Sequence, residues 1–232
     1  RDASKIGLIS SIHPWESGLD NSPIWDGPLN KVKIDGNLKY ERRDLNVSKS
    51  ENRPLKKDYD AYITLLNKLK KHKYNPNKII SESMFNVIDI GFNSILIRAT
   101  KDLVEVAKKF NLDFSDLKKK TMMSEESLIK LYKDEEQSFF SYDFKNHNLI
   151  KVDAISNYFI LFANIGNEDV NNKIINKLKK SNSQKEYFFT TVNPIDKTFE
   201  ETRYWRGPVW INSNWIIPVS YTHLRAHETQ FD

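Results

Sequence analysis

The longest amphipathic pattern in the chain runs from Phe85 to Phe110. Apolar residues recur there at intervals of three and four, at Ile88, Phe92, Ile95, Leu96, Ala99, Leu103, Val106, Ala107 and Phe110. This spacing places them on one face of an α-helix, which has about 3.6 residues per turn. Gly91 marks either a weak point or the true start. The pattern therefore predicts a long core helix.

Other segments repeat the helical pattern on a smaller scale. Apolar residues at the same spacing predict helices over Asp58–Lys71, Ile155–Phe162 and Asp169–Lys180. A further helix is expected from Ser124 to Tyr132, with Ser124 as the N-cap and acidic residues in the first turn. Ser138–Val152 reads instead as a short hairpin. Helices joined by long, aromatic and polar loops favour an all-α layout in which the loops carry the chemistry.

Composition limits the possible functions. The chain has 232 residues, enough for one domain or a large piece of one, and it contains no Cys. Disulfides, thiolate metal sites and a Cys nucleophile are therefore excluded, which fits a reducing, cytoplasmic compartment. The net charge is +5, but the Lys residues are scattered over predicted helix faces, so we expect a solvated surface and no nucleic-acid partner. No run approaches the ~18 apolar residues of a membrane span.

The last residues depart from this pattern. An apolar helical pattern at Trp215–Ile217 gives way to Pro218 and a polar segment without periodicity. Residues 219–229 resemble a translated sequencing adapter, a kind of scar that is kept out of fold reasoning. We therefore expect a domain over residues 1–217 and a non-native tail over residues 218–232. His223 and His227 lie in that tail without a third ligand, so no metal site is expected.

A dense polar and aromatic segment, HPWESGLDNSPIWD, runs from His13 to Asp26. Pro14, Gly18 and Pro23 interrupt any helical period, which predicts a loop or a broken helix end. Polar and aromatic groups crowded onto a shaped loop suit a small polar ligand. The alternative is a surface loop whose two Trp side chains plug the core.

The second dense motif, YWRGPVWINSNW, runs from Tyr204 to Trp215. Pro208 follows Gly207 at the expected first turn of a helix. This motif and the first are about 180 residues apart. Neither segment alone can surround a ligand, so we predict that the two meet at one site.

The two motifs resemble the paired signatures of family 63-type glycoside hydrolases. Their order agrees with that family, and FNVIDIGFNSIL, from Phe85 to Leu96, is also similar. The resemblance covers about residues 6–217 and points to the bacterial branch that includes mannosylglycerate and glucosylglycerate hydrolases. It implies an incomplete (α/α)6 toroid, similar in fold to trehalase, with the site at one mouth. It also implies an inverting hydrolase of a small α-glycoside that needs no cofactor.

The resemblance assigns the role of general acid to Asp20. Inverting hydrolysis needs such a protonated carboxyl group and a second, ionised carboxylate roughly 6.5–9.5 Å away. Trp15 and Trp25 flank Asp20 and could raise its pKa by lowering the local dielectric constant. Glu16 is the rival acid, or a ligand for a sugar hydroxyl. The expected substrate-binding residues are Trp15, Glu16, Asn21, Trp25, Tyr204, Trp205, Arg206 and Trp210.

Two of these assignments have structural alternatives. Arg206 could pair bidentately with an acidic aglycone such as glycerate, or with a structural carboxylate. Tyr204, Trp205 and Trp210 would form the wall of the pocket, although core packing is an equal alternative for each Trp.

The general base of the family follows the YWRGPVW helix, and nothing between Asp20 and Trp215 matches its motif. We therefore expect the parent protein to be a hydrolase and this chain alone to be inactive. The competing class is a non-catalytic carbohydrate-binding helical domain. A helical nucleic-acid binder is third, and strongly salt-dependent binding of nucleic acid would support it. The sugar, the aglycone and the oligomeric state stay open.

Overall fold

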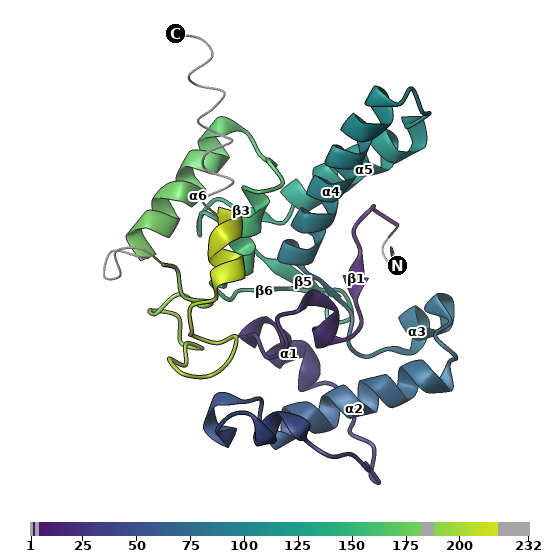
Figure 1. Ribbon diagram of the computed structural model, residues 1–232, viewed down its shortest axis with the longest axis vertical. Helices are drawn as coiled ribbons and strands as arrows, with labels where there is room; N and C mark the ends of the chain where they lie inside the picture. Colours follow the sequence, from purple (N-terminus) through teal and green to yellow (C-terminus); the bar gives the residue numbers. More distant parts are fainter. Residues whose placement is uncertain (1, 3–4, 182–187, 218–232) are drawn as a thin grey trace.

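The structure is a computed structural model that describes residues 2, 5–181 and 188–217 (Figure 1). The expected tail over residues 218–232 lies outside the described residues, and so do His223 and His227. The principal helices are α1 (Asp26–Leu29), α2 (Lys56–Lys71), α3 (Pro76–Glu82), α4 (Ile90–Lys109), α5 (Ser115–Ile129) and α6 (Glu168–Ser181). Residues 211–217 are also helical.

Helix α4 begins at Ile90, one residue before Gly91. The side chain of Asp89 accepts hydrogen bonds from the backbone N–H of Gly91, at 3.2 Å, and of Phe92, at 3.1 Å, and so caps the helix. A Cβ atom on Gly91 would lie 2.8 Å from Cβ of Ser156, so the glycine allows α4 to pack closely on the 3-10 helix η5 (Ile155–Ile160).

The expected long helix is confirmed over Ile90–Lys109, but the face predicted to be its core is wrong. Four residues of that face are exposed, at 42%, 54%, 47% and 70%: Ile95, Leu103, Val106 and Phe110. The helix instead buries Ile90, Asn93, Ser94, Ile97 and Val104, together with Ala107 of the predicted face.

A small antiparallel sheet accompanies the helices. Its four strands lie in the order β1 (Ser10–Ser11), β2 (Val87–Ile88), β5 (Ser141–Asp143) and β6 (Asn148–Ile150). A separate pair joins β3 (Tyr132–Lys133) to β4 (Ser138–Phe139). Strands β5 and β6 form the hairpin expected over Ser138–Val152. The chain is mainly helical, as predicted, but an all-α description omits this sheet.

Several predicted boundaries were wrong. Helix α5 begins at Ser115, after the side chain of Asp113 accepts a hydrogen bond from the Ser115 N–H at 3.0 Å. Ser124 therefore lies inside the helix, and its hydroxyl donates to the carbonyl oxygen of Gly7 at 2.6 Å. Residues 155–160 form a 3-10 helix where an α-helix was expected. Pro208 precedes the last described helix and does not start it.

Two hydrophobic clusters hold these elements together. One surrounds η5 and contains residues of α4 and α6, among them Ile97 and Ile174. The other contains Trp25, Tyr62 and Trp205, so it includes residues of both dense motifs and of α2. Helices α4 and α5 project from the body as a hairpin, whereas α2 lies along the opposite end (Figure 1). No described helix combines the length and apolar character that crossing a membrane requires.

Candidate active site

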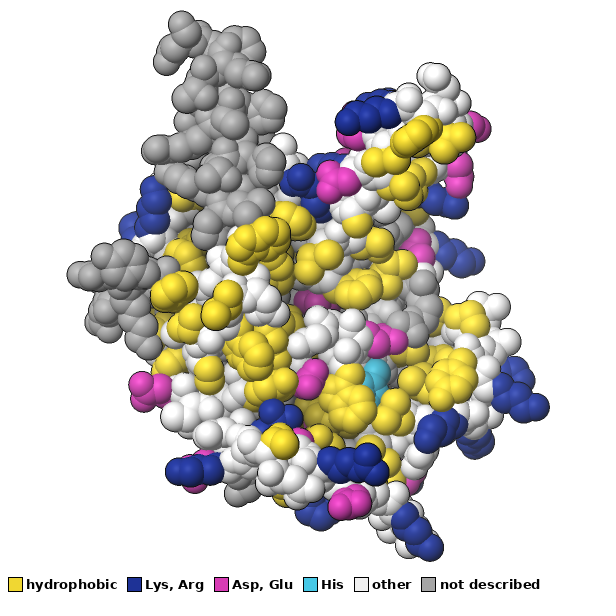
Figure 2. Space-filling view, viewed as in Figure 1, with side chains coloured by type: hydrophobic (Ala, Val, Ile, Leu, Met, Phe, Trp, Pro, Cys, Tyr) yellow, Lys and Arg dark blue, Asp and Glu magenta, His cyan; other side chains and the backbone are white. Residues whose placement is uncertain are grey.

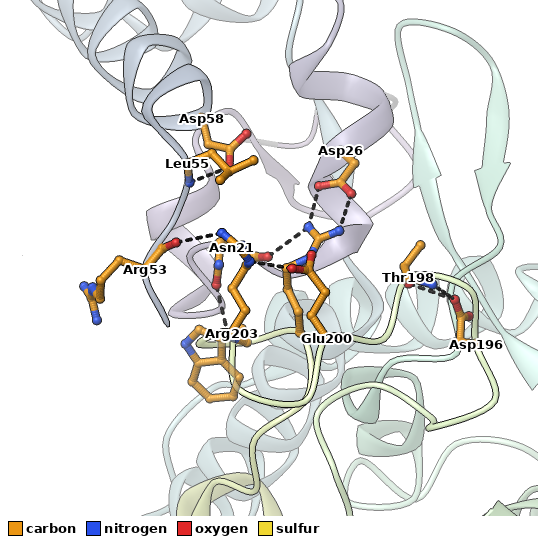
Figure 3. Close-up of polar contacts among 11 residues, drawn as sticks. Asn21, Asp26, Arg53, Leu55, Asp58, Asp196, Thr198, Glu200 and Arg203 are labelled. Carbon is orange, nitrogen blue, oxygen red and sulfur yellow. Dashed lines mark hydrogen bonds and ion pairs between the residues drawn. The ribbon is translucent and has the colours of Figure 1, made fainter. Parts of the chain in front are cut away.

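The two dense motifs meet, as predicted. The side-chain oxygen of Asn21 accepts a hydrogen bond from the backbone N–H of Trp205 at 3.0 Å. Arg206 donates two hydrogen bonds to the carboxylate of Asp26, at 2.8 and 2.7 Å (Figure 3). Hydrophobic side chains gather across the same face of the molecule, with acidic side chains among them (Figure 2). Segments about 180 residues apart therefore build one site.

His13 anchors the first motif, which folds as two short 3-10 helices, η1 (Pro14–Ser17) and η2 (Pro23–Trp25). Its Nδ1 accepts a hydrogen bond from the backbone N–H of Trp15 at 3.1 Å, which leaves the proton on Nε2. Nε2 then donates to the carbonyl oxygen of Tyr62 at 3.0 Å. Burial lowers the pKa of His13 to about 4, although the Tyr62 carbonyl acts in the opposite direction. The ring is therefore neutral at pH 7.

Asp20 follows η1 and is partly buried. The hydroxyl of Tyr62, on α2, donates to the backbone oxygen of Asp20 at 2.8 Å and fixes this part of the loop. Burial raises the pKa of the Asp20 carboxyl, while the positive charge of Arg53 and a hydrogen bond from the Asp20 backbone partly offset the rise. A carboxyl group in this environment keeps its proton to higher pH than an exposed one, which is what a general acid requires.

The two Trp residues of the first motif lie in different places. Trp15 is 38% exposed, and its indole contacts the rings of His13, Tyr59 and Tyr62. Trp25 has no exposed surface, and its Nε1 donates to the carbonyl oxygen of Leu19 at 2.7 Å. The expectation that Trp25 contacts a sugar is corrected: in this structure it is a core residue.

The aromatic residues of the second motif pack on one another. Trp205 is 5% exposed and stacks on Trp210, with ring centroids 4.5 Å apart. Trp210 in turn donates from Nε1 to the backbone oxygen of Tyr204 at 3.0 Å. Among the described residues, Nε1 of Trp205 and Nδ2 of Asn21 have no hydrogen-bond partner although both atoms are buried. Each is a donor that a ligand oxygen could satisfy.

Arg206 takes the structural alternative. Besides the bidentate pair with Asp26, its Nε lies 2.7 Å from Oε1 of Glu200, and its Nη1 donates to the backbone oxygen of Asn21 at 3.4 Å. We refer to Asn21, Asp26, Glu200 and Arg206 as the clasp. The side chain of Arg206 is 13% exposed within the clasp. Its Nη1 and Nη2 donate to protein oxygens, and its Nε is in ion-pair contact with Glu200, so an acidic aglycone would need another cation.

Glu16 also has a local partner. Its Oε2 accepts a hydrogen bond from the backbone N–H of Ile12 at 2.9 Å, so this oxygen holds the entry to η1. The side chain is partly buried and stays a candidate for both roles predicted for it, rival acid and ligand for a sugar hydroxyl.

Sequence reasoning missed Arg53 and Tyr62. Tyr62 lies in Asp58–Lys71, a segment that was used only to predict a helix, and its hydroxyl contact with Asp20 depends on the folded loop. Arg53 lies in an irregular segment without a pattern, and its guanidinium group lies 4.3 Å from the ring centre of Tyr204. It also donates to Asp44 at 3.2 Å. Burial raises the pKa of Asp44, but hydrogen bonds from Arg42 and Arg53 outweigh it and lower the value to about 2.

The fold is the one found in GH63-type glycoside hydrolases. The crystal structure of the GH63 mannosylglycerate hydrolase from Thermus thermophilus in complex with Tris matches with a TM-score of 0.93 and 36% identity. The match covers 96% of this chain and 54% of that chain. Neutral trehalase from Saccharomyces cerevisiae, at 15% identity and a TM-score of 0.53, shares the fold over 72% of this chain and 36% of that chain. The predicted (α/α)6-type architecture is confirmed.

The chain belongs to the family of the mannosylglycerate hydrolase MGH1-like glycoside hydrolase domain, whose model matches residues 1–229. The mannosylglycerate hydrolase of Thermus thermophilus is 37% identical over 95% of this chain and 53% of its own length. The glucosylglycerate hydrolase of Mycolicibacterium hassiacum is 26% identical over 94% of this chain and 51% of its own length. The predicted family is confirmed, and the chain spans about half the length of these curated relatives.

Proposed function

We propose that the whole protein hydrolyses a small α-glycoside, either mannosylglycerate, glucosylglycerate or a short α-glucoside, with inversion at the anomeric carbon. The observation that carries the proposal is the position of Asp20. It is a partly buried carboxyl group with a raised pKa, in a chain whose relatives are named for hydrolysis of the first two substrates. The loop that holds it meets the second motif of the family.

In the proposed reaction, Asp20 donates its proton to the glycosidic oxygen as the bond from that oxygen to the anomeric carbon breaks. A general base removes a proton from water, and the water oxygen attacks the opposite face of the anomeric carbon. The sugar and the aglycone each leave with a neutral hydroxyl group. The general base then releases its proton to solvent, and Asp20 takes up a proton from solvent. The exposed part of Trp15 would contact the apolar face of the sugar ring.

The general base is proposed to lie outside residues 1–217, because no segment between Asp20 and Trp215 matches the base motif of the family. The chain alone is then inactive, and the whole protein is active. Residues 1–217 are proposed to form part of one catalytic domain, and residues 218–232 a non-native tail. Sequencing the uninterrupted gene tests whether residues 218–232 are native and whether a base motif follows residue 217. Assaying this chain and the whole protein on the same glycosides tests whether this chain alone is inactive.

An acidic aglycone such as glycerate needs a cation near the leaving oxygen. Arg206 is engaged by two carboxylates, those of Asp26 and Glu200, whereas Arg53 donates from Nε to Asp44 and lies close enough to Asp20 to lower its pKa. The side chain of Arg53 is 17% exposed, and its guanidinium group lies over the ring of Tyr204. We therefore assign the aglycone carboxylate to Arg53, with the exposed part of Tyr204 beside it.

The decisive experiment compares Asp20→Asn with Glu16→Gln in the whole protein. General-acid assistance is typically worth about 10²–10⁴ in rate, so Asp20→Asn should lower kcat by that factor and spare substrate binding. Glu16→Gln should raise KM at least as much as it lowers kcat if Glu16 holds the sugar. Asp102→Asn, a substitution in an exposed ion pair of α4, is the matched control.

NMR of the first-formed product decides the stereochemistry. Turnover of Asp20→Asn close to that of the wild type would move the acid role to Glu16. A product that first keeps the α-configuration would overturn inversion. Sugar binding without hydrolysis in the whole protein would instead favour the carbohydrate-binding class. A cytoplasmic location, proposed because the chain lacks Cys, is tested by cell fractionation.

A further inference from the structure

The clasp joins the loop of Asp20 to the second motif through one guanidinium group. Asp26 contributes both carboxylate oxygens, and Glu200 contributes one oxygen at 2.7 Å. Arg206 is 13% exposed, while each carboxylate partner is 42% exposed. Bidentate pairs between Arg and a carboxylate restrict orientation as well as distance, and a Lys ammonium cannot reproduce them.

The clasp acts on the backbone that carries Asp20. Asn21 is the next residue along the chain, and its backbone and side-chain oxygens accept hydrogen bonds from Arg206 and from the Trp205 N–H (Figure 3). On the other side, the Tyr62 hydroxyl holds the backbone oxygen of Asp20. The Asp20 peptide is thus held from α2 and from the second motif, and only the second contact depends on Arg206.

We propose that Arg206 is a positioning residue for the general acid, acting through Asn21 and Asp26 rather than by contact with the substrate. This inference rests on the proposed function of Asp20. Without the bidentate pair, the loop from Asn21 to Asp26 loses its link to the second motif, and the Asp20 carboxyl moves away from the glycosidic oxygen. A misplacement of about 1 Å can lower a rate about 10²-fold.

Substrates that differ only in the leaving group separate this role from a general loss of structure. A glycerate alkoxide needs a proton to leave, whereas fluoride leaves without one. In the whole protein, Arg206→Lys should lower kcat/KM about 10–100-fold on the glycerate glycoside, because acid assistance is impaired. On the α-glycosyl fluoride of the same sugar the loss should stay below about threefold. Equal losses on both substrates would overturn the proposal.

Two further variants make the comparison sharper. Asp26→Asn should show the same selective loss, and the double variant of Asp26 and Arg206 should be no worse than either single one, because the two residues act as a unit. Arg98→Lys makes the same change in an ion pair with Asp102, at 3.0 Å on α4, and should behave as the wild type on both substrates. Additive losses in the double variant would refute the shared action.

Hydrogen exchange of peptide 13–26 gives a readout that needs no turnover. Arg206→Lys should speed its exchange at least tenfold, and Arg98→Lys should leave it unchanged. If the wild type hydrolyses neither substrate but exchange rises, the proposed function fails and the positioning of the loop stands. If the wild type is active but exchange and the leaving-group ratio do not change, the positioning proposal fails alone. The ratio of kcat/KM on the glycerate glycoside to kcat/KM on the fluoride does not depend on the folded fraction, so partial unfolding of the variant does not obscure it.

Discussion

Protonation of His13 should weaken the protein at acid pH. The ring is 2% exposed, and both nitrogens are engaged in the folded protein: Nδ1 accepts from Trp15 and Nε2 donates to Tyr62. A protonated imidazole has two N–H donors and no acceptor, so it cannot keep the contact with the Trp15 N–H. Folding therefore excludes the proton, and burial lowers the pKa of His13 from 6.5 to about 4.

The size and sign of the effect follow from linkage. Between pH 6.5 and about 4, the unfolded chain binds a proton at His13 and the folded protein does not, so stability rises with pH in this window. The contribution is fully present above pH 6.5 and is lost as the pH falls toward 4. One pKa unit corresponds to about 1.36 kcal/mol, so the whole window is worth about 3 kcal/mol. The raised pKa values of Asp20, Asp58 and Asp89 make stability fall with rising pH, which is the opposite of the effect of His13.

Urea unfolding of the whole protein at pH 7.5 and pH 4.5 isolates the contribution of His13. His13→Asn keeps an acceptor for the Trp15 N–H but has no group that titrates in this range. The loss of unfolding free energy on acidification should be about 2–3 kcal/mol smaller in His13→Asn than in the wild type. His147→Asn, in an exposed turn, is the control and should match the wild type. Equal losses in wild type and His13→Asn would show that burial does not suppress protonation.

Two further substitutions probe the support of the site. Tyr62→Phe removes only the hydroxyl that binds the backbone oxygen of Asp20, so thermal or urea unfolding should show a loss of about 1–2 kcal/mol. In kinetic assays, this variant should lower kcat more than it raises KM. Gly207→Ala places a Cβ atom 2.1 Å from the backbone oxygen of Glu200, which should cost about 3 kcal/mol in unfolding and disturb the clasp. Stability equal to the wild type in either variant contradicts the packing described here.

Periodicity located elements whose burial repeats along the chain. Asp58–Lys71 became α2, and Phe85–Phe110 contained α4. The period did not find the buried face of α4, which contains Ile97 and Val104, whereas Leu103, Val106 and Phe110 of the predicted face are exposed. The two-residue strands β1 and β2 have no such repeat, since their pairing is set by segments distant in sequence. Ser124 had the chemistry of an N-cap, but its hydroxyl is used by the carbonyl of Gly7, a partner that only the folded chain supplies.

The sequence also predicted some features of the site and left others to be decided by the fold. The paired motifs predicted correctly that His13–Asp26 and Tyr204–Trp215 would meet, because their residue strings are specific to one family. Composition could not tell which Trp of a motif faces a ligand, and Trp25 proved to be fully buried. Nor could it choose between the two partners considered for Arg206. That choice depended on the distance to Asp26, which is a property of the fold.

The clasp also has a consequence for synthesis. Asp26 and Arg206 are 180 residues apart, so Asp26 leaves the ribosome long before its partner exists. At roughly 5–20 residues per second, the interval is about 9–36 s. For most of that time α2 and its Tyr62 can already hold the first motif, since Tyr62 follows Asp20 by 42 residues, but the second motif cannot. The loop of Asp20 is therefore among the last parts of this half to reach its final shape during translation. A pause in translation before the codon for Arg206 would lengthen the period in which the nascent chain is open to proteases at this loop.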